Sequence, residues 1–287
     1  MTNCPYCKSK NTIKRGMRKT QNRGRIQRFY CKVCKKRFVI DEGFFRMRND
    51  PHKITASLDL YYRGMSLRKA QDHLGVFYEH NASYVTVLNW IRKYANLIGG
   101  YLDNVKLKTS TQMTFDEVEF RTKGKQSWFF DVMDMETRYM VGSDYMEDRS
   151  SKRIRRVLHK VRDRILQEPT DVYTDGLLTY RKAIKKCLWK NRQEHKIAHH
   201  VKDSRSGSFN WKIERLHENI RERTKTMRQF KSLESARAIM KGWEIWYNFC
   251  RKHQGINAYP YELATDLKLG KNKWLDLIRL STCLEPL

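Results

Sequence analysis

The alternation of apolar and polar residues in segment 111–142 is the clearest structural signal in the chain. Apolar residues alternate with polar ones over residues 113–120, and two short apolar runs follow at 128–133 and 139–142. Basic and polar breaks separate these stretches, so the pattern predicts three antiparallel strands joined by tight turns. Asp116 falls in the middle of the first strand. Aspartate is depleted from strands, so a carboxylate at this position indicates a specific role.

Two later acidic residues also stand at points that the hydrophobic pattern defines. Residues 171–175 predict a short fourth strand that ends in Asp175, where Gly176 can turn the chain. Apolar residues at helical spacing predict a later helix that carries Glu214 near its start. Carboxylates from strands and a helix can hold two divalent cations for phosphoryl displacement, and magnesium or manganese suits such an all-oxygen site.

Three helices are predicted between residues 50 and 100. They begin at Pro51, after Ser66 and after Ser83, which are residue types that favour helix starts. A longer helix after two others, with polar residues on its outer side, is the outline of a helix-turn-helix DNA-binding unit. The alternative is a three-helix linker whose basic face is only solvated. The Gly-Gly pair at 99–100 would form a hinge to the next domain.

The spacing of the cysteines predicts a metal site. Four of the seven cysteines form two tight pairs, Cys4 with Cys7 and Cys31 with Cys34, and 23 residues separate the pairs. The odd total and the absence of a secretory signal indicate a reducing compartment, where such pairs are metal ligands rather than disulfides. Four thiolates complete a tetrahedral zinc site, so residues 1–49 are expected to form a zinc ribbon. Chance CxxC pairs or a redox site are the alternatives.

The positive charge of the chain indicates a polyanionic partner. The formal net charge is +28, and the first 50 residues carry 15 Lys and Arg against three acids. DNA, RNA or an anionic membrane could supply the opposite charge, but no apolar run approaches transmembrane length, so nucleic acid is the economical interpretation. A purely structural ribbon, or one that grips a protein, is the alternative. The expected DNA contacts in the ribbon and on the third helix are Arg28, Lys35, Lys36, Arg37, Thr86, Asn89, Arg92 and Lys93.

Several motifs occur in the same order as in a known enzyme family. Along the chain they are TFDEVEF, KGK, VMD, YTDGLLTYRKAI, IERLHENIRERTKTMRQFKS and YNFCRKHQGI. They cover about residues 113–263 and resemble the catalytic core of DDE transposases and retroviral-type integrases. Within that group the resemblance is closest to the insertion-sequence transposases that move by cointegrate formation.

The resemblance implies an RNase H-like α/β fold, in which helices flank a mixed sheet. It also implies that Asp116, Asp175 and Glu214 are catalytic and bind magnesium or manganese, while Glu218, one helical turn further on, is the rival third ligand. The spacing of 38 residues between Asp175 and Glu214 is somewhat longer than usual in the family. Arg221 stands where the family usually carries a lysine. Arginine keeps the positive charge, and we expect this residue to contact DNA phosphate.

These observations predict four regions along the chain. They are a zinc ribbon at 1–49, a helix-turn-helix domain at 50–100, an RNase H-like catalytic domain at 101–265 and a C-terminal tail at 266–287. The polar segment 202–210, just before the helix of Glu214, is a candidate lid over the substrate.

The function that follows is that of an insertion-sequence DDE transposase. Such an enzyme would bind the terminal inverted repeats of double-stranded DNA, cleave the DNA and join the 3′ ends to target DNA. Recombination of two ends implies a homodimer or a higher oligomer, and the expected location is the prokaryotic cytoplasm at the nucleoid, away from membranes. A domesticated DNA-binding protein without catalysis and a nuclease that cuts without joining are the alternatives. A zinc-ribbon transcription regulator is a weaker one, because it leaves the central domain unexplained.

Overall fold

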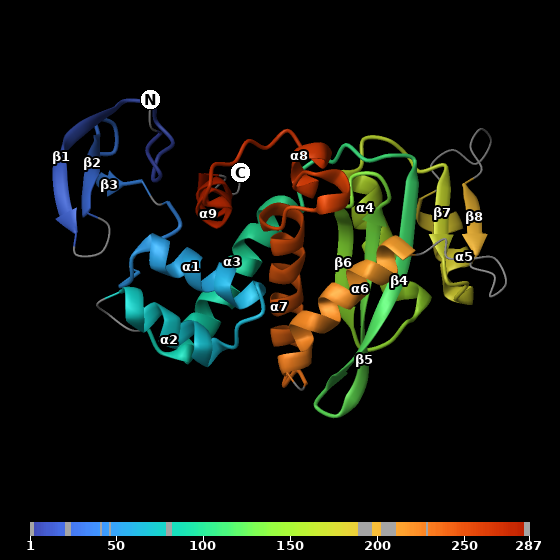
Figure 1. The fold of residues 1–287 in the computed structure, drawn as a ribbon. Helices are drawn as coiled ribbons and strands as arrows, with labels where there is room; N and C mark the ends of the chain where they lie inside the picture. Colours follow the sequence, from blue (N-terminus) through green and yellow to red (C-terminus); the bar gives the residue numbers. More distant parts are fainter. Residues whose placement is uncertain are drawn as a thin grey trace.

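Helices cover both faces of a central five-stranded sheet, and a small separate sheet lies at the N-terminal end of the molecule (Figure 1). The computed structural model describes residues 3–20, 24–40, 42–45, 47–78, 82–188, 197–201, 211–227 and 229–283. The candidate lid at 202–210 lies outside these residues.

The central sheet confirms the predicted three-stranded meander and extends it by two parallel strands. Its strands are β4 (Gln112–Thr122), β5 (Lys125–Asp134), β6 (Met140–Met146), β7 (Asp171–Thr174) and β8 (Ala198–Val201). They lie in the order β6-β5-β4-β7-β8, with β5 antiparallel to β4 and β6, and with β7 parallel to β4 and β8. Lys123 and Gly124 form the β4–β5 turn with φ of 50° and 77°, the backbone that tight hairpins require. The fold is therefore the expected α/β class with an RNase H-like mixed sheet.

A buried aspartate holds the turn between β5 and β6. Asp134 is fully buried, and its carboxylate accepts hydrogen bonds from the backbone N–H and the hydroxyl of both Ser110 and Thr137, at 2.6–2.8 Å. Four donors satisfy a carboxylate that would otherwise be costly to bury. The chain leaves this turn at Arg138, whose φ of 60° is uncommon for a residue with a side chain.

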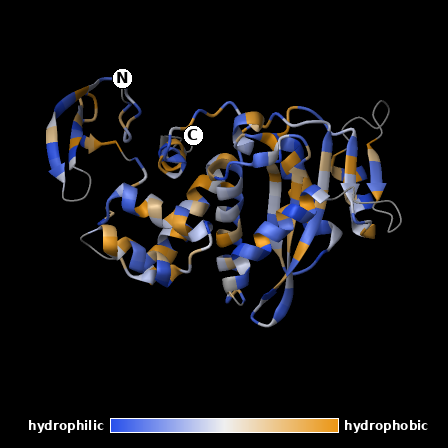
Figure 2. Cartoon of the chain, viewed as in Figure 1, coloured by the Kyte–Doolittle hydropathy of each residue, from blue (hydrophilic) through white to orange (hydrophobic). Residues whose placement is uncertain are grey.

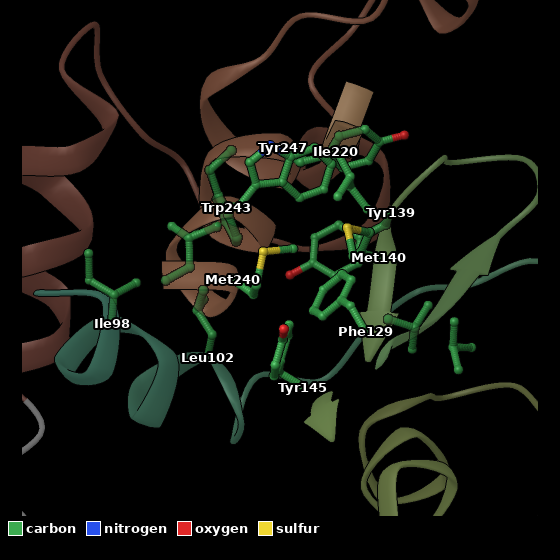
Figure 3. Packing of buried hydrophobic residues seen from close by; sticks show 14 of the residues in the cluster. Ile98, Leu102, Phe129, Tyr139, Met140, Tyr145, Ile220, Met240, Trp243 and Tyr247 are labelled. Atoms are coloured by element: carbon green, nitrogen blue, oxygen red, sulfur yellow. The ribbon is translucent and has the colours of Figure 1, made fainter. Parts of the chain in front are cut away.

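Two pairs of helices cover opposite faces of the sheet. They are α4 (Ser151–Arg164) with α5 (Leu178–Cys187), and α6 (Trp211–Thr224) with α7 (Leu233–Ile245). Side chains alternate between the two faces of a strand, so neighbouring residues of β5 contact helices on opposite faces of the sheet. Phe130 meets the ring of Tyr180 on α5 at 5.8 Å, whereas Phe129 lies in the core beside α7 (Figure 3). Strand β5 is thus covered on both faces, which explains its nearly continuous apolar run.

Helix α7 links the sheet to the N-terminal helices. Figure 3 shows Met240, Trp243 and Tyr247 between sheet residues on one side and Ile98 and Leu102 on the other. All of these side chains belong to one continuous hydrophobic cluster. The chain continues from α7 into the π-helical turn η2 (Trp246–Cys250). The remaining short elements are η1 (Lys225–Met227), η3 (Gln254–Ile256) and α8 (Pro260–Ala264).

The three predicted N-terminal helices are present with their predicted starts. They are α1 (Pro51–Tyr62), α2 (Leu67–Phe77) and α3 (Tyr84–Leu102). The side chains of Asp50, Ser66 and Ser83 accept hydrogen bonds from first-turn N–H groups, as N-caps do. Helix α9 (Lys273–Cys283), near the C-terminal end of the chain, returns to pack against α1 and α3. No helix in the described ranges has both the length and the apolarity needed to cross a membrane.

The hinge expected at Gly99 and Gly100 is wrong, because α3 continues through both glycines to Leu102. Helix α3 packs along α7, and a Cβ at Gly99 would meet the side chain of Lys241 on that helix. Within segment 82–188 the chain therefore passes from the helices to the sheet without a break in α3 or in the core.

The N-terminal sheet has only a minimal core. Its strands β1 (Thr12–Thr20), β2 (Gly24–Cys31) and β3 (Arg37–Val39) are antiparallel, and β1 and β2 are mostly hydrophilic (Figure 2). The buried cluster consists of Cys4, Phe29, Cys31 and Phe38, separate from the main core. Four side chains give too little apolar burial to hold a sheet by themselves, so this unit depends on another source of stability.

The contact between α7 and α1 generates a stability prediction. A Cβ at Gly242 of α7 would overlap the hydroxyl of Tyr62 and lie 3.1 Å from the Cβ of Ala95. We expect Gly242→Ala to lower the free energy of unfolding by about 1–3 kcal/mol, the usual cost of overpacking a core. Chemical denaturation monitored by circular dichroism measures the change. Gly100→Ala is the matched control, since no atom outside its neighbours and its own helix backbone lies within 4 Å of the added Cβ, and alanine favours a helix by about 0.5–1 kcal/mol.

A second substitution separates this contact from other effects. Tyr62→Phe removes the overlapping hydroxyl, together with its 3.2 Å hydrogen bond to the carbonyl of Ile239. Combined with Gly242→Ala, it should recover part of the lost stability, which gives a non-additive pair. Equal stabilities of Gly242→Ala and Gly100→Ala would contradict the close approach.

Candidate active site

The pairing of β4 with β7 brings two of the expected catalytic residues together. The paired residues differ by 59 in number, as in Gln112 with Asp171 and Thr114 with Tyr173. The same offset places Asp175, directly after β7, opposite Asp116 of β4 (175 − 116 = 59). Ligand oxygens of Asp116, Glu117 and Asp175 indeed lie within 4.8 Å of one another.

A buried histidine lies on the other side of Asp116. Asp131 of β5 pairs directly with Asp116 across the antiparallel ladder and is fully buried. His217 of α6 is 4% exposed, and its Nε2 lies 3.0 Å from Oδ2 of Asp131. Its Nδ1 lies 3.6 Å from Oδ2 of Asp116. The imidazole therefore connects α6 to both aspartates, three residues after Glu214 on the same helix.

The charges of this cluster perturb one another. Burial raises the pKa of Asp116 to about 7, although His217 and the backbone N–H of Glu117 act in the opposite direction. Burial also raises the pKa of Asp131. For His217, burial lowers the pKa, but the charges of Asp131 and Asp116 more than compensate and the net shift is upward. A divalent cation beside carboxylates with raised pKa values would favour their charged forms.

Glu117 is a member of the carboxylate group that the hydrophobic pattern did not identify. Its side chain is 6% exposed, and Oε1 accepts a hydrogen bond from Arg149 at 2.8 Å. Oε2 accepts one from the hydroxyl of Tyr180 on α5. Both oxygens are therefore engaged from the face of the sheet that α5 covers. Its position directly after Asp116 was the only sequence signal.

Glu214 lies on the first turn of α6 and is exposed. It is not one of the three carboxylates that gather within 4.8 Å. Helix α6 nevertheless faces the site, because His217 contacts Asp116 and Asp131. The rival Glu218 is exposed as well and pairs with Arg215 at 3.4 Å. The structure thus brings Asp116 and Asp175 together and places Glu214 on the adjacent helix.

The donors of the two candidate metal sites suit different ions. The group at Asp116 offers only carboxylate oxygen, which fits magnesium or manganese. The four sulfurs of Cys4, Cys7, Cys31 and Cys34 lie within 4.8 Å of one another, which fits a tetrahedral zinc site.

The backbone of the ribbon prepares the sulfur site. Each CxxC pair is followed by a lysine with positive φ, 57° at Lys8 and 58° at Lys35, so both pairs sit on tight knuckles. Hydrogen bonding from the N–H of Cys34 is the main cause that lowers the pKa of Cys31 to about 6. The thiolate is the form that binds metal, so the knuckles favour the binding form of this cysteine.

The expected DNA contacts fall into two groups. In the ribbon, Arg28, Lys35, Lys36 and Arg37 are all exposed. On α3 the four residues differ, and only Asn89 and Lys93 are exposed.

The two other α3 residues make internal contacts. Thr86 lies in the helix cap, with its hydroxyl 3.0 Å from that of Ser83. Arg92 donates a hydrogen bond to the hydroxyl of Ser235 on α7 at 2.9 Å. The guanidinium of Arg92 therefore already has a structural role at the contact between α3 and α7.

Arg221 is exposed on α6, one further turn along from His217. It lines a cavity of about 750 Å³ between α6 and the end of β4, together with Glu218, Glu222 and Lys225. Its charge opposes the upward pKa shift of His217, so it is close enough to act on the carboxylate cluster.

Comparison with known families identifies the enzyme class. A family model described as a DDE domain matches residues 110–253, half of the 287-residue chain, and the match includes Asp116, Asp175 and Glu214. The chain belongs to the DDE transposase and integrase superfamily. The resemblance inferred from the motifs is confirmed, and this DDE enzyme is a metal-dependent polynucleotidyl transferase of the transposase type.

Solved structures with a similar arrangement come from viral integrases. The HTLV-2 integrase catalytic core domain in complex with magnesium, in its trimeric form, has a TM-score of 0.39 and 11% identity, covering 55% of this chain and 98% of that one. The simian T-cell lymphotropic virus intasome has a TM-score of 0.41 and 13% identity, covering 67% of this chain and 69% of that one. The assignment of this DDE enzyme rests on the family model rather than on these distant likenesses. No curated protein sequence matches the chain.

The ribbon of this DDE enzyme should depend on zinc. Cys31→Ser removes a buried sulfur from the four-sulfur group. We expect the purified variant to lose its bound zinc, measured by elemental analysis, and β1–β3 to lose protection from hydrogen exchange. The main core should stay folded, because its cluster is separate. Cys187→Ser, at a buried cysteine outside the group, is the control that keeps zinc. Full zinc content in Cys31→Ser would contradict the site.

Magnesium binding at the carboxylate group should depend on pH. Asp116 has a pKa of about 7 in the metal-free protein, so below that pH the ion must displace a proton. We expect the apparent affinity to rise from about pH 6 to about pH 8 and then level off, with proton release at the lower pH. Calorimetry in buffers of different ionisation enthalpy measures both.

Two variants serve as references for that titration. Asp116→Asn should lose the proton release and most of the affinity. Asp163→Asn, at an exposed residue of α4, should titrate like the unmodified protein. An affinity that is constant between about pH 6 and about pH 8 would show that Asp116 does not exchange its proton for the ion.

Proposed function

We propose that this enzyme is an insertion-sequence transposase. It binds the terminal inverted repeats of its element, cleaves the DNA and joins the freed 3′ ends to target DNA. Membership of the DDE superfamily is the observation that carries the proposal. The net charge of +28 and the four-cysteine ribbon support a DNA substrate. Joining two ends requires a homodimer or a higher oligomer, and such an enzyme acts in the prokaryotic cytoplasm at the nucleoid.

The proposed catalytic residues are Asp116, Asp175 and Glu214. Two divalent cations bound by them would stabilise the entering and leaving oxygens of an in-line displacement at phosphorus. The sheet supplies rigidity, because Asp116 stands on β4 and Asp175 follows directly after β7, which pairs with β4. The contact of His217 with Asp131 and Asp116 keeps α6, and with it Glu214, beside those strands.

Glu214 is preferred to Glu117 as the third ligand because it matches the third acid of the family motif in the sequence. Both oxygens of Glu117 already accept bonds, from Arg149 and from Tyr180. Each carboxylate oxygen can accept more than one contact, so these bonds do not block an ion but hold the side chain toward α5, which suits a positioning role beside Asp116. Arg221, on the same helix as Glu214, would neutralise phosphate charge.

The four proposed regions would divide the work. The ribbon at 1–49 and the helical region at 50–100 would recognise the repeats through phosphate and base-edge contacts. The catalytic region at 101–265 would carry out the chemistry. The tail at 266–287 contains α9, whose packing on α1 and α3 would brace the recognition helices.

A strand-transfer assay tests the function. The full chain is incubated with magnesium, a plasmid target and a linear DNA that carries the terminal repeat flanking the coding sequence. We expect joined products that disappear with chelator. Asp116→Asn and Glu214→Gln should each reduce joining by more than about 1000-fold, as loss of an essential catalytic group does.

Two further variants assign the third carboxylate. Glu117→Gln should cost about 10–100-fold, the range for a residue that positions a metal ligand. Glu218→Gln should stay near the activity of the unmodified enzyme. The reverse ranking of Glu117→Gln and Glu214→Gln would transfer the ligand role to Glu117. Repeat binding without cleavage would indicate a domesticated DNA-binding protein, and cleavage without joining would indicate a nuclease.

A further inference from the structure

A strongly basic pocket lies on the side of α6 away from the aspartates. It has a volume of about 430 Å³ and lies between α6, the β5–β6 turn and the segment that follows η2. Its cationic lining consists of Arg138, Lys212, Arg215, Arg251 and Lys252, joined by His253. No carboxylate is among the lining residues in the described part of the chain. Five cations around one hollow, with no anion in its wall, indicate a site for an anionic ligand.

The fold holds the cations of α6 and of the β5–β6 turn in place. Arg138 lies at the end of the β5–β6 turn, which Asp134 holds by hydrogen bonds. The backbone of Arg138 is left-handed, with φ of 60°. Its guanidinium lies 4.8 Å from the ring centroid of Trp211. Nζ of Lys212 donates a hydrogen bond to the carbonyl of Met135 at 2.9 Å. These contacts fix two of the cations that line the hollow.

The segment after η2 contributes a buried donor without a partner. Nη1 of Arg251 is buried and has no hydrogen-bond partner among the described residues. Nε2 of His253 is also buried and without a partner there, and it donates only in one tautomer of the imidazole. Both side chains contact Tyr247, whose ring centroid lies 5.8 Å from the guanidinium of Arg251 and 4.5 Å from the ring of His253. A buried donor without a partner costs free energy, and a bound acceptor would recover it.

The pKa shifts of these side chains also favour an anionic ligand. Burial lowers the pKa of Arg251 and Arg138. Burial, with the charges of Arg251 and Arg138, lowers the pKa of His253 to about 4. The carboxylate of Glu222 acts in the opposite direction on Arg251, but the net shift remains downward. Burial thus disfavours the charged forms of these side chains, and a bound anion would offset that cost.

We propose that this pocket binds a backbone phosphate of the DNA strand that enters the carboxylate site. The identity of that strand rests on the proposed function. Lys212 and Arg215 lie within two residues of Glu214, or about 3 Å along the helix axis, so a phosphate held there belongs to a strand that passes the catalytic helix. The half-exposed ring of Trp211 at the rim is a surface on which an unpaired base can stack. An acidic protein segment would use the charges but not this ring.

Binding of single-stranded DNA of arbitrary sequence tests the pocket without requiring any chemistry. Affinity of the full chain is measured by fluorescence anisotropy, in chelator, over a series of salt concentrations. We expect Arg138→Gln/Arg215→Gln to weaken binding about 10-fold and to reduce the slope of log affinity against log salt by about 1–2. The single variant Arg215→Lys keeps the charge and leaves Arg138 intact, so it should retain most of the affinity of the unmodified protein.

Charge-matched and fold controls accompany these variants. Lys185→Gln/Lys186→Gln removes two exposed charges from α5, on the opposite face of the sheet, and should leave the slope nearly unchanged. Circular dichroism melting curves check that each variant is folded. Lys212→Gln is a second pocket variant, to be used if Arg138→Gln fails to fold.

The outcomes separate the pocket from the proposed function. A pocket variant that is folded and binds DNA with unchanged affinity and slope overturns the inference, even if the enzyme joins DNA. Pocket-dependent binding by a protein that never cuts DNA would sustain the pocket and refute the transposase. Pocket-dependent binding of oligoglutamate with no effect on DNA would overturn the inference in favour of an acidic protein segment.

Discussion

The register of β4 between β5 and β7 is the constraint on which the active site depends. It places Asp131 of β5, Asp116 of β4 and Asp175, directly after β7, in one row. Burial raises the pKa of Asp116 and of Asp131, and the charges of Asp131 and Asp175 raise the pKa of Asp116 further, so the two buried carboxylates oppose folding. The apolar sheet core and the imidazole of His217 offset that cost. The result is a preformed set of oxygens whose charge a divalent cation complements.

Helix α6 connects this row of carboxylates to the surface of the protein. A buried ion pair contributes little net stability, but it restricts geometry, since only one rotation of the helix lets His217 reach Asp131 and Asp116. That rotation decides where every other residue of α6 lies. Glu214 and Arg221 are exposed at the edge of the carboxylate site, and Lys212 with Arg215 faces the basic pocket. One contact thus orients an acidic and a basic surface around the same helix.

Sequence patterns predicted those features whose causes are local. The alternation around Asp116 defined the meander, Ser66 and Ser83 defined helix starts, and the CxxC spacing defined the ribbon. Features that arise from tertiary contacts escaped prediction. Nothing local distinguishes His217 from the charged residues beside it until α6 is laid against β5. Gly99 and Gly100 suggested a hinge because glycine weakens isolated helices, yet packing against α7 keeps α3 continuous.

Helices α3 and α7 and the sheet share one packed core, which limits how DNA recognition can be coupled to catalysis. The helices at 50–100 and the sheet share one core, so any base that α3 contacts would stand at a constant distance from Asp116. The ribbon has its own core, but the segment that follows it is anchored. Gly43 accepts a hydrogen bond from Tyr94 at 3.0 Å, and Glu42 pairs with Arg279 of α9 at 3.1 Å. In the proposed transposase, adjustment to DNA would therefore arise in the ribbon rather than between α3 and the sheet.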